Sequence, residues 1–155
     1  MGDAPDRALL RDRGTAVALC VRSNRILGAG EPPVAAYLDE GNVVAVGTDS
    51  LASTPSLDLL DEAVALRDLA RRQGYDAADL DRRIVEAATV GGAQAMGLDD
   101  IGVLRPGARA DLAVFEVPVT ASGAGRGSAA YTAVLELGAG RCVATVLGGT
   151  LVHRR

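Results

Sequence analysis

Short apolar runs alternate with amphipathic stretches over the first hundred residues of the chain. The runs at 15–20 (TAVALC) and 42–46 (NVVAV) are continuous and too short for a buried helix. They are typical of strands buried on both faces, as in a parallel sheet. The polar, Gly- and Pro-containing stretch 21–33 indicates a loop. Apolar residues at helical spacing predict helices at 5–13, 34–40, 57–72, 76–88 and 93–96.

The clearest of these helices is the one at 57–72. Ser56 is placed to cap its first turn. Its apolar residues form one stripe at helical spacing, namely Leu59, Ala63, Leu66 and Ala70. Further along the chain, Gly91 and Gly92 are expected to interrupt the helical pattern before the short helix at 93–96.

The pattern changes near residue 100. Pro106-Gly107 is typical of a type II turn, Gly148-Gly149 of a closing hairpin, and 121–129 of a Gly/Ser-rich loop. Strands are predicted at 101–104, 111–117, 134–137, 143–147 and 150–152. The chain therefore divides into an alternating α/β part, 1–100, and a mostly β part, 101–155.

The first part contains too few strands to stand alone. Two parallel strands do not make a stable sheet, because three or more strands with covered faces are needed. The chain also begins inside a predicted helix. We therefore expect an incomplete fold whose front is missing.

Composition and charge exclude several classes of function. With 155 residues, 48% of them hydrophobic, the chain has enough apolar surface for a core and is not disordered as a whole. A net charge of −4 without a basic stripe argues against a nucleic-acid partner. No apolar run approaches the ~20 residues of a membrane helix, so no membrane partner is expected. Cys20 and Cys142 form no CxxC pair, which favours a cytoplasmic protein with free thiols.

Five segments carry a resemblance to a known family. They are LCVRSN at 19–24, PPVAAYLDEGN at 32–42, VGTDSLAS at 46–53, EAATVGGAQAMGL at 86–98 and GVLRPGARADLAVFEVP at 102–118. In this order and spacing the chain resembles the C-terminal part of the amidohydrolase superfamily, metal-dependent hydrolases built on a (β/α)₈ barrel. The resemblance implies an α/β fold, with the last two β/α units of a TIM-type barrel followed by strands of a small composite β-sandwich. It is most similar to the aminohydrolase branch, which includes deaminases of purine-like rings and of aminofutalosine.

The resemblance assigns one catalytic and metal-binding position, Asp49, which follows the buried run 42–46. In the family, the aspartate at the end of the eighth strand binds the metal and handles the proton of the metal-activated water. The position fits, because barrel active sites lie at the carboxyl ends of the strands. A carboxylate there can act first as a base and then as an acid. By spacing alone, Asp49 is more typical of a turn or a helix cap than of a catalytic residue.

The same resemblance nominates substrate contacts. The family's loop after the seventh strand usually reads Cys-Pro-x-Ser-Asn, and here Val21 replaces the proline. Arg22, Ser23 and Asn24 become candidate substrate contacts, since guanidinium and amide groups bind polar rings and carboxylates. An ordinary polar loop is the alternative. Ser50 is a further candidate contact, or a cap for the segment that follows it.

The other metal ligands of the family are missing from the sequence. The family has a His-x-His on its first strand and one His each on the fifth and sixth strands, whereas this chain has only His153. A catalytic zinc needs about three protein ligands. We therefore expect a divalent metal, zinc or iron, in the complete enzyme, and no tight metal binding by this chain alone.

Two functions stay open at this point. The first is the C-terminal fragment of a C–N hydrolase that deaminates a small, amino-purine-like molecule, with a His-x-His segment encoded upstream. The second is a non-catalytic remnant, or one half of a split enzyme, that pairs its strand edges with a second chain or a second copy of itself.

Overall fold

A pair of parallel strands lies at the centre of the first part of the molecule. The computed structural model describes residues 2–118 and 126–155. In it, β1 (Val17–Leu19) pairs in parallel with β2 (Val44–Val46), in an unbroken register. Both strands were predicted at these places, and both are shorter than the apolar runs that contain them.

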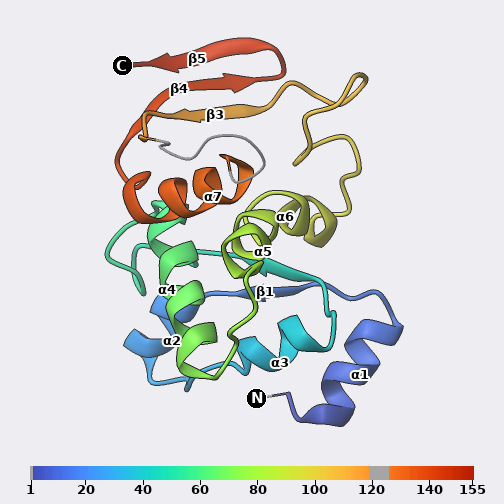
Figure 1. Ribbon diagram of the computed structural model, residues 1–155. Coiled ribbons are helices and arrows are strands. Elements are labelled where there is room, and N and C mark those ends of the chain that lie inside the picture. Colours follow the sequence, from blue (N-terminus) through green and yellow to red (C-terminus); the bar gives the residue numbers. More distant parts are fainter. Residues whose placement is uncertain (1, 119–125) are drawn as a thin grey trace.

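Six helices surround this pair of strands (Figure 1). They are α1 (Ala4–Asp12), α2 (Val21–Leu27), α3 (Val34–Asp39), α4 (Leu59–Arg72), α5 (Leu80–Ala87) and α6 (Val90–Ala95). Helices α2 and α3 lie in the connection between β1 and β2, as a parallel pair requires. The helices predicted at 5–13, 34–40, 57–72 and 76–88 are confirmed, with bounds that differ by a few residues.

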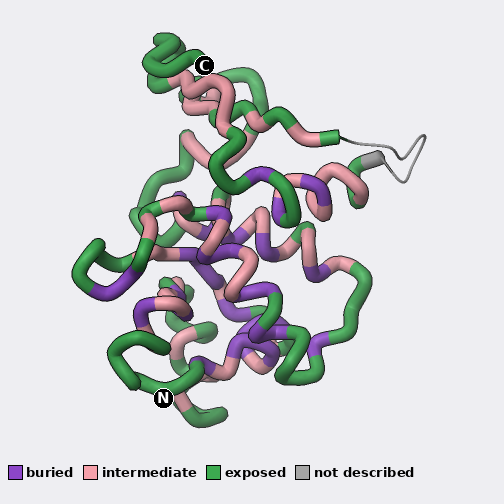
Figure 2. Tube along the Cα trace, turned by 90° about the vertical axis from the view of Figure 1, so that its left-hand side faces the viewer, coloured by how far each residue is buried: buried purple, intermediate pink, exposed green. Residues whose placement is uncertain are grey.

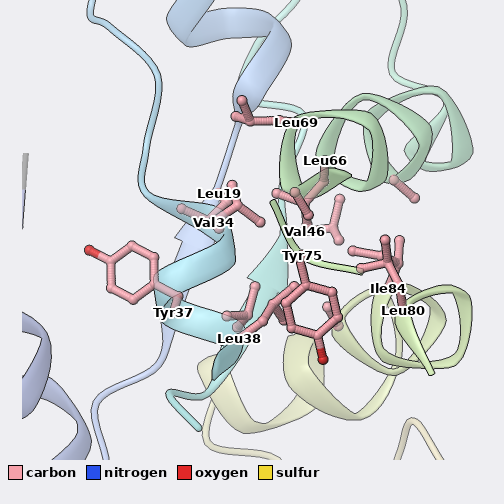
Figure 3. Close-up of a cluster of buried hydrophobic side chains, with 14 of the residues drawn as sticks. Leu19, Val34, Tyr37, Leu38, Val46, Leu66, Leu69, Tyr75, Leu80 and Ile84 are labelled. Carbon is pink, nitrogen blue, oxygen red and sulfur yellow. The ribbon is translucent and has the colours of Figure 1, made fainter. Parts of the chain in front are cut away.

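The hydrophobic core lies between the two strands and helices α3, α4 and α5, where the buried segments of Figure 2 concentrate. Figure 3 shows Leu66 and Leu69 of α4, Ile84 of α5 and Val46 of β2 among its side chains. The predicted stripe of α4 is buried at three of its four positions, and Leu59 remains 36% exposed. With one Phe and no Trp in the chain, aliphatic side chains and two tyrosines supply this core.

A three-stranded antiparallel sheet lies at the other end of the molecule. Its strands are β3 (Leu112–Phe115), β4 (Cys142–Leu147) and β5 (Thr150–Arg154), in the order β3-β4-β5. Helix α7 (Arg126–Leu137) lies between this sheet and helices α4 and α5 (Figure 1). The predicted hairpin at Gly148-Gly149 is confirmed, since β4 and β5 meet there.

Two side-chain hydrogen bonds join this end of the molecule to the helices around the core. Asp58 accepts the backbone N–H of Leu60 through Oδ1 and that of Gly140 through Oδ2, the latter at 2.8 Å. The Thr132 hydroxyl of α7 donates to Asp81 of α5 at 2.6 Å. Asp58 therefore caps α4 and holds the turn before β4 with the same carboxylate.

Helix α4 starts two residues later than the predicted helix at 57–72. The cap of this helix is Asp58, and the helix begins at Leu59. The predicted cap, Ser56, lies in the turn before it, where its Oγ accepts the backbone N–H of Asp58.

The predicted loop at 21–33 was wrong over its first residues, which form α2. Helix α2 ends at Gly28, whose φ of 66° is the left-handed conformation that glycine adopts readily. The predicted strand at 134–137 was also wrong, because these residues belong to α7. A short apolar run does not distinguish a strand from a helix segment.

Two further predictions failed for reasons of backbone geometry. The stretch 101–104 forms no strand, and Gly102 within it has a φ of 77°, which a strand does not accommodate. Gly91 and Gly92 lie inside α6 instead of interrupting the helical pattern. A Cβ atom at Gly91 would overlap the carbonyl oxygen of Val44, so glycine here permits α6 to approach β2.

Part of the predicted Gly/Ser-rich loop, residues 121–125, lies outside the described residues, and residues 126–129 belong to α7. Among the described helices, none is both long and apolar enough to span a membrane.

Candidate functional site

The carboxyl ends of β1 and β2 meet at one edge of the parallel pair. After β1 the chain passes through Cys20 into helix α2, and after β2 it forms the turn that carries Asp49. The last ladder hydrogen bond runs from the Gly47 backbone N–H to the Leu19 carbonyl at 3.0 Å. In α/β barrels this edge carries the active-site groups.

Asp49 itself has an unusual backbone conformation. Its φ is 61°, and among the described residues other than glycine it is the one with a positive φ. A left-handed residue with a side chain persists where its surroundings fix it, and such residues concentrate at functional sites. The residue is exposed, so its carboxylate stands at the surface of this part of the chain.

Two buried hydroxyl groups hold one oxygen of this carboxylate. Ser23 Oγ donates to Asp49 Oδ2 at 2.7 Å, and Ser53 Oγ donates to the same oxygen at 2.8 Å. These two hydrogen bonds lower the pKa of Asp49, with Ser23 as the larger cause. Asp49 is therefore an ionised carboxylate at neutral pH. The other oxygen, Oδ1, receives no side-chain hydrogen bond from the residues that the structure describes.

Glu62 of α4 anchors the start of α2. Its side chain is fully buried, and its Oε1 accepts the backbone N–H of Arg22 at 2.9 Å. The N-cap residue, Cys20, makes no side-chain cap hydrogen bond, so Glu62 satisfies an amide that the helix leaves free. Burial raises the pKa of Glu62, while the Arg22 amide and the guanidinium charge oppose that rise.

The structure brings some of the sequence candidates to Asp49 and separates others. Ser23 and Ser50 lie at the carboxylate: Ser23 bonds to its side chain, and Ser50 is exposed and next in sequence. Arg22 lies against α4 instead, with its guanidinium 3.4 Å from Asp61 and 3.7 Å from Glu62. The side chain of Asn24 is half-buried on α2.

Sequence reasoning missed two residues that shape this site, Ser53 and Glu62. Glu62 precedes Leu66 by four and Leu69 by seven residues in the helix at 57–72. That spacing places it on the buried face and was a readable signal. Ser53 follows Asp49 by four residues within a turn, where spacing does not indicate which side chains meet.

The described residues do not form a complete metal site. No group of three or more His, Cys, Asp and Glu side chains lies together among them. His153 lies on β5, in the sheet at the other end of the molecule (Figure 1). Burial raises the pKa of the Cys20 thiol, with the charges of Glu62 and Asp49 adding to the effect, which disfavours the thiolate that binds metals. Asp49 therefore fits as one ligand of a site completed by other residues, and not as a site by itself.

Comparison with known proteins shows what this arrangement is similar to. The sequence profile described as "Amidohydrolase family" matches residues 3–152. A 5-methylthioadenosine/S-adenosylhomocysteine deaminase of Teredinibacter turnerae is 40% identical over 116 residues, which are 74% of this chain and 26% of the relative. An isoxanthopterin deaminase from an unknown prokaryotic organism is 36% identical over 132 residues, covering 74% of this chain and 27% of that protein.

A solved structure extends the similarity to almost the whole chain. The crystal structure of an adenosine deaminase from Xanthomonas campestris with bound zinc superimposes with a TM-score of 0.85 at 27% identity. The match covers 99% of this chain and 35% of that chain. The chain thus spans about a quarter of the length of the curated relatives it matches.

Proposed function

The chain belongs to the amidohydrolase family, and from that premise we propose that it is the C-terminal part of a metal-dependent C–N hydrolase. In this proposal residues 1–100 are the last two β/α units of a TIM-type barrel, and residues 101–155 contribute to a small β-sandwich. The reaction is the deamination of an amino-purine-like or related ring, the class of substrate that the names of the relatives share. The alternatives from the sequence are a non-catalytic remnant and one half of a split enzyme; the incomplete metal site among the described residues is compatible with both, and the geometry of Asp49 favours a catalytic role.

The observation that carries the proposal is the geometry of Asp49. Its carboxylate stands at the carboxyl edge of the parallel strands, where barrel enzymes place their reacting groups. One oxygen is fixed by two hydroxyls, and the ionised form is favoured. Two buried hydroxyls that converge on one oxygen of an exposed carboxylate, in a residue with a positive φ, support a chemical role for this side chain.

Asp49 has two roles in this proposal. It supplies one ligand to a divalent metal, zinc or iron, whose other ligands lie outside this chain. When bound, the metal supplies a nucleophilic water at neutral pH. The Asp49 carboxylate takes a proton from the attacking water and passes it to the leaving nitrogen, so that ammonia departs.

Substrate contacts follow from the same edge. We assign Asn24 and Ser50 to this role, because α2 and the Asp49 turn bring both residues to the carboxyl ends of the strands. Arg22 would have to leave its ion pairs with Asp61 and Glu62 to join them, and we therefore assign it to the support of α2.

The parallel pair also supports the presence of further strands. β1 and β2 are paired only with each other among the described residues, so that each has a free edge. Two parallel strands are too few for an independent sheet. We propose that strands from another segment or another chain continue the sheet and bring the missing metal ligands.

A chimera tests the proposed function. This chain replaces the matching quarter of the Teredinibacter turnerae deaminase, and ammonia release is measured with 5′-methylthioadenosine, S-adenosylhomocysteine, adenosine and isoxanthopterin. We expect ammonia release from at least one substrate. We expect this release to be lost in the Asp49→Asn chimera, in which the side chain keeps its size and planar shape but loses its charge. A folded chimera that releases no ammonia, or an equally active Asp49→Asn chimera, contradicts the proposal.

A further inference from the structure

Two serines from separate elements converge on one oxygen of Asp49. Ser23 comes from α2 after β1, and Ser53 from the turn after β2. Their hydroxyl oxygens lie 2.9 Å from each other, and both lie within 2.8 Å of Oδ2. Each hydroxyl carries one proton. If both protons go to Oδ2, none is left for a bond between the serines, and the carboxylate is the group that holds the two oxygens together.

The burial of the three residues divides their roles. Ser23 is 1% exposed and Ser53 is 6% exposed, whereas Asp49 is exposed. A ligand at this surface therefore meets the carboxylate and not the hydroxyls beneath it. Ser23, which the sequence nominates as a substrate contact, lies too deep for that role.

We propose that Ser23 and Ser53 are positioning residues, which fix Asp49 through Oδ2 and hold its carboxylate in one orientation at the carboxyl edge of β1 and β2. The inference rests on the proposed function for what Oδ1 meets, and on the hydrogen bonds alone for how Asp49 is held. A carboxylate with one oxygen fixed by two donors loses the freedom to rotate about its side-chain bonds. Groups that hold a metal ligand in this way orient it and strengthen its binding.

The helix that carries Ser23 is itself anchored. Glu62 binds the first turn of α2 through the Arg22 amide, from a side chain that is fully buried. Ser23 is the next residue along, so the anchor fixes the position of its hydroxyl. The backbone of Ser53 is fixed within its turn, because its N–H donates to the Ser50 carbonyl at 3.0 Å. Both donors are thus placed before any ligand arrives, which is what preorganisation requires.

The experiment reads the orientation of the Asp49 side chain in the purified 155-residue chain. Three-bond Hα–Hβ couplings of Asp49 are measured by NMR in the wild type, Ser23→Ala, Ser53→Ala and the double variant. One large and one small coupling indicate a single rotamer, and two intermediate couplings indicate averaging. We expect a single rotamer in the wild type, partial averaging in each single variant and full averaging in the double variant.

Thr54→Val is the matched control. Thr54 is 4% exposed in the same turn, but its hydroxyl donates to the Ser56 carbonyl and does not contact Asp49. The control therefore removes a buried hydroxyl without touching the carboxylate, and its Asp49 couplings should equal those of the wild type. Unchanged couplings in both single variants, or averaging in the wild type, overturn the proposal. The single variants decide the matter if the double variant does not fold.

The same substitutions in the chimera separate this inference from the proposed function. We expect kcat to fall about 10–100-fold in Ser23→Ala and Ser53→Ala with KM within twofold, because loss of a group that orients a metal ligand has effects of this size. If the couplings of Asp49 are averaged in the serine variants but the folded chimera with the wild-type chain is inactive, the positioning role stands and the proposed deaminase activity is refuted. An active chimera in which both single variants retain full kcat and unchanged couplings refutes the positioning role alone.

Discussion

Replacing Gly91 by alanine tests how closely α6 packs on the strand that leads to Asp49. A Cβ atom built at Gly91 overlaps the carbonyl oxygen of Val44 and lies 3.1 Å from the Val44 carbonyl carbon. Both atoms belong to the backbone of β2, so no flexible side chain can move aside. The helix must shift away from the strand, or the strand must bend.

Gly92 provides a matched control one residue along the same helix. Its Cβ would lie 4.0 Å from the nearest atom, the Ala87 carbonyl oxygen, which is ordinary contact. Alanine is favoured over glycine inside a helix by about 1 kcal/mol, and this gain applies to both positions. Subtracting one variant from the other therefore isolates the steric term.

The expected magnitudes follow from these contacts. Overpacking in a core costs about 1–3 kcal/mol, and a backbone neighbour places Gly91→Ala at the upper end of that range. After the helix gain, we expect Gly91→Ala to lose about 2 kcal/mol and Gly92→Ala to gain up to about 1 kcal/mol. Urea unfolding followed by circular dichroism measures both free energies. Equal stabilities for the two variants would refute the close packing of α6 on β2.

Three further predictions concern charged side chains. Asp58→Ala removes the cap of α4 and the acceptor of the Gly140 amide, so we expect a loss of about 1–2 kcal/mol in urea unfolding, largely avoided in Asp58→Asn. The pKa of Glu62 is raised by burial, so the folded state binds its proton more tightly than the unfolded state. Relative to Glu62→Gln, the wild type should therefore lose stability as the pH rises from the ordinary glutamate pKa through the raised one, and a parallel pair of stability curves would contradict this. The pKa of Asp79 is lowered, chiefly by its hydrogen bond with Arg83. The ionised Asp79 therefore stabilises the folded state above the ordinary aspartate pKa, and this stabilisation is lost as the pH falls through the lowered pKa. Asp79→Asn should flatten the acid side of the stability curve, and an unchanged slope there would count against the ion pair.

The sequence predicted the parts of the fold that depend on local pattern. The strands β1 and β2 are continuous apolar runs, and α4 shows a stripe at helical spacing, so each could be predicted from its own residues. Helix α2 could not, because its first turn is stabilised by Glu62, forty residues away in the chain. Likewise, Gly91 resembles a helix breaker unless the approach of β2 is known.

The candidate site shows the same division. The place of Asp49 at the carboxyl end of β2 could be predicted, since it follows a buried strand in segments that resemble a known family, while its chemical role stays a prediction. The roles of its neighbours could not, because they depend on which side chains the turns bring together. Ser23 lies beneath the carboxylate, Arg22 against α4, and Ser53 beside Ser23, and no spacing in the sequence distinguishes these three placements.

The metal content of the purified 155-residue protein tests the central claim most directly. In the proposed function, Asp49 supplies one metal ligand and the remaining ligands come from outside this chain. Elemental analysis after purification with zinc in the medium should therefore find far less than one metal ion per chain, in the wild type and in Asp49→Asn alike. About one zinc or iron per chain, lost in Asp49→Asn, would contradict the claim, because this chain would then hold a complete metal site.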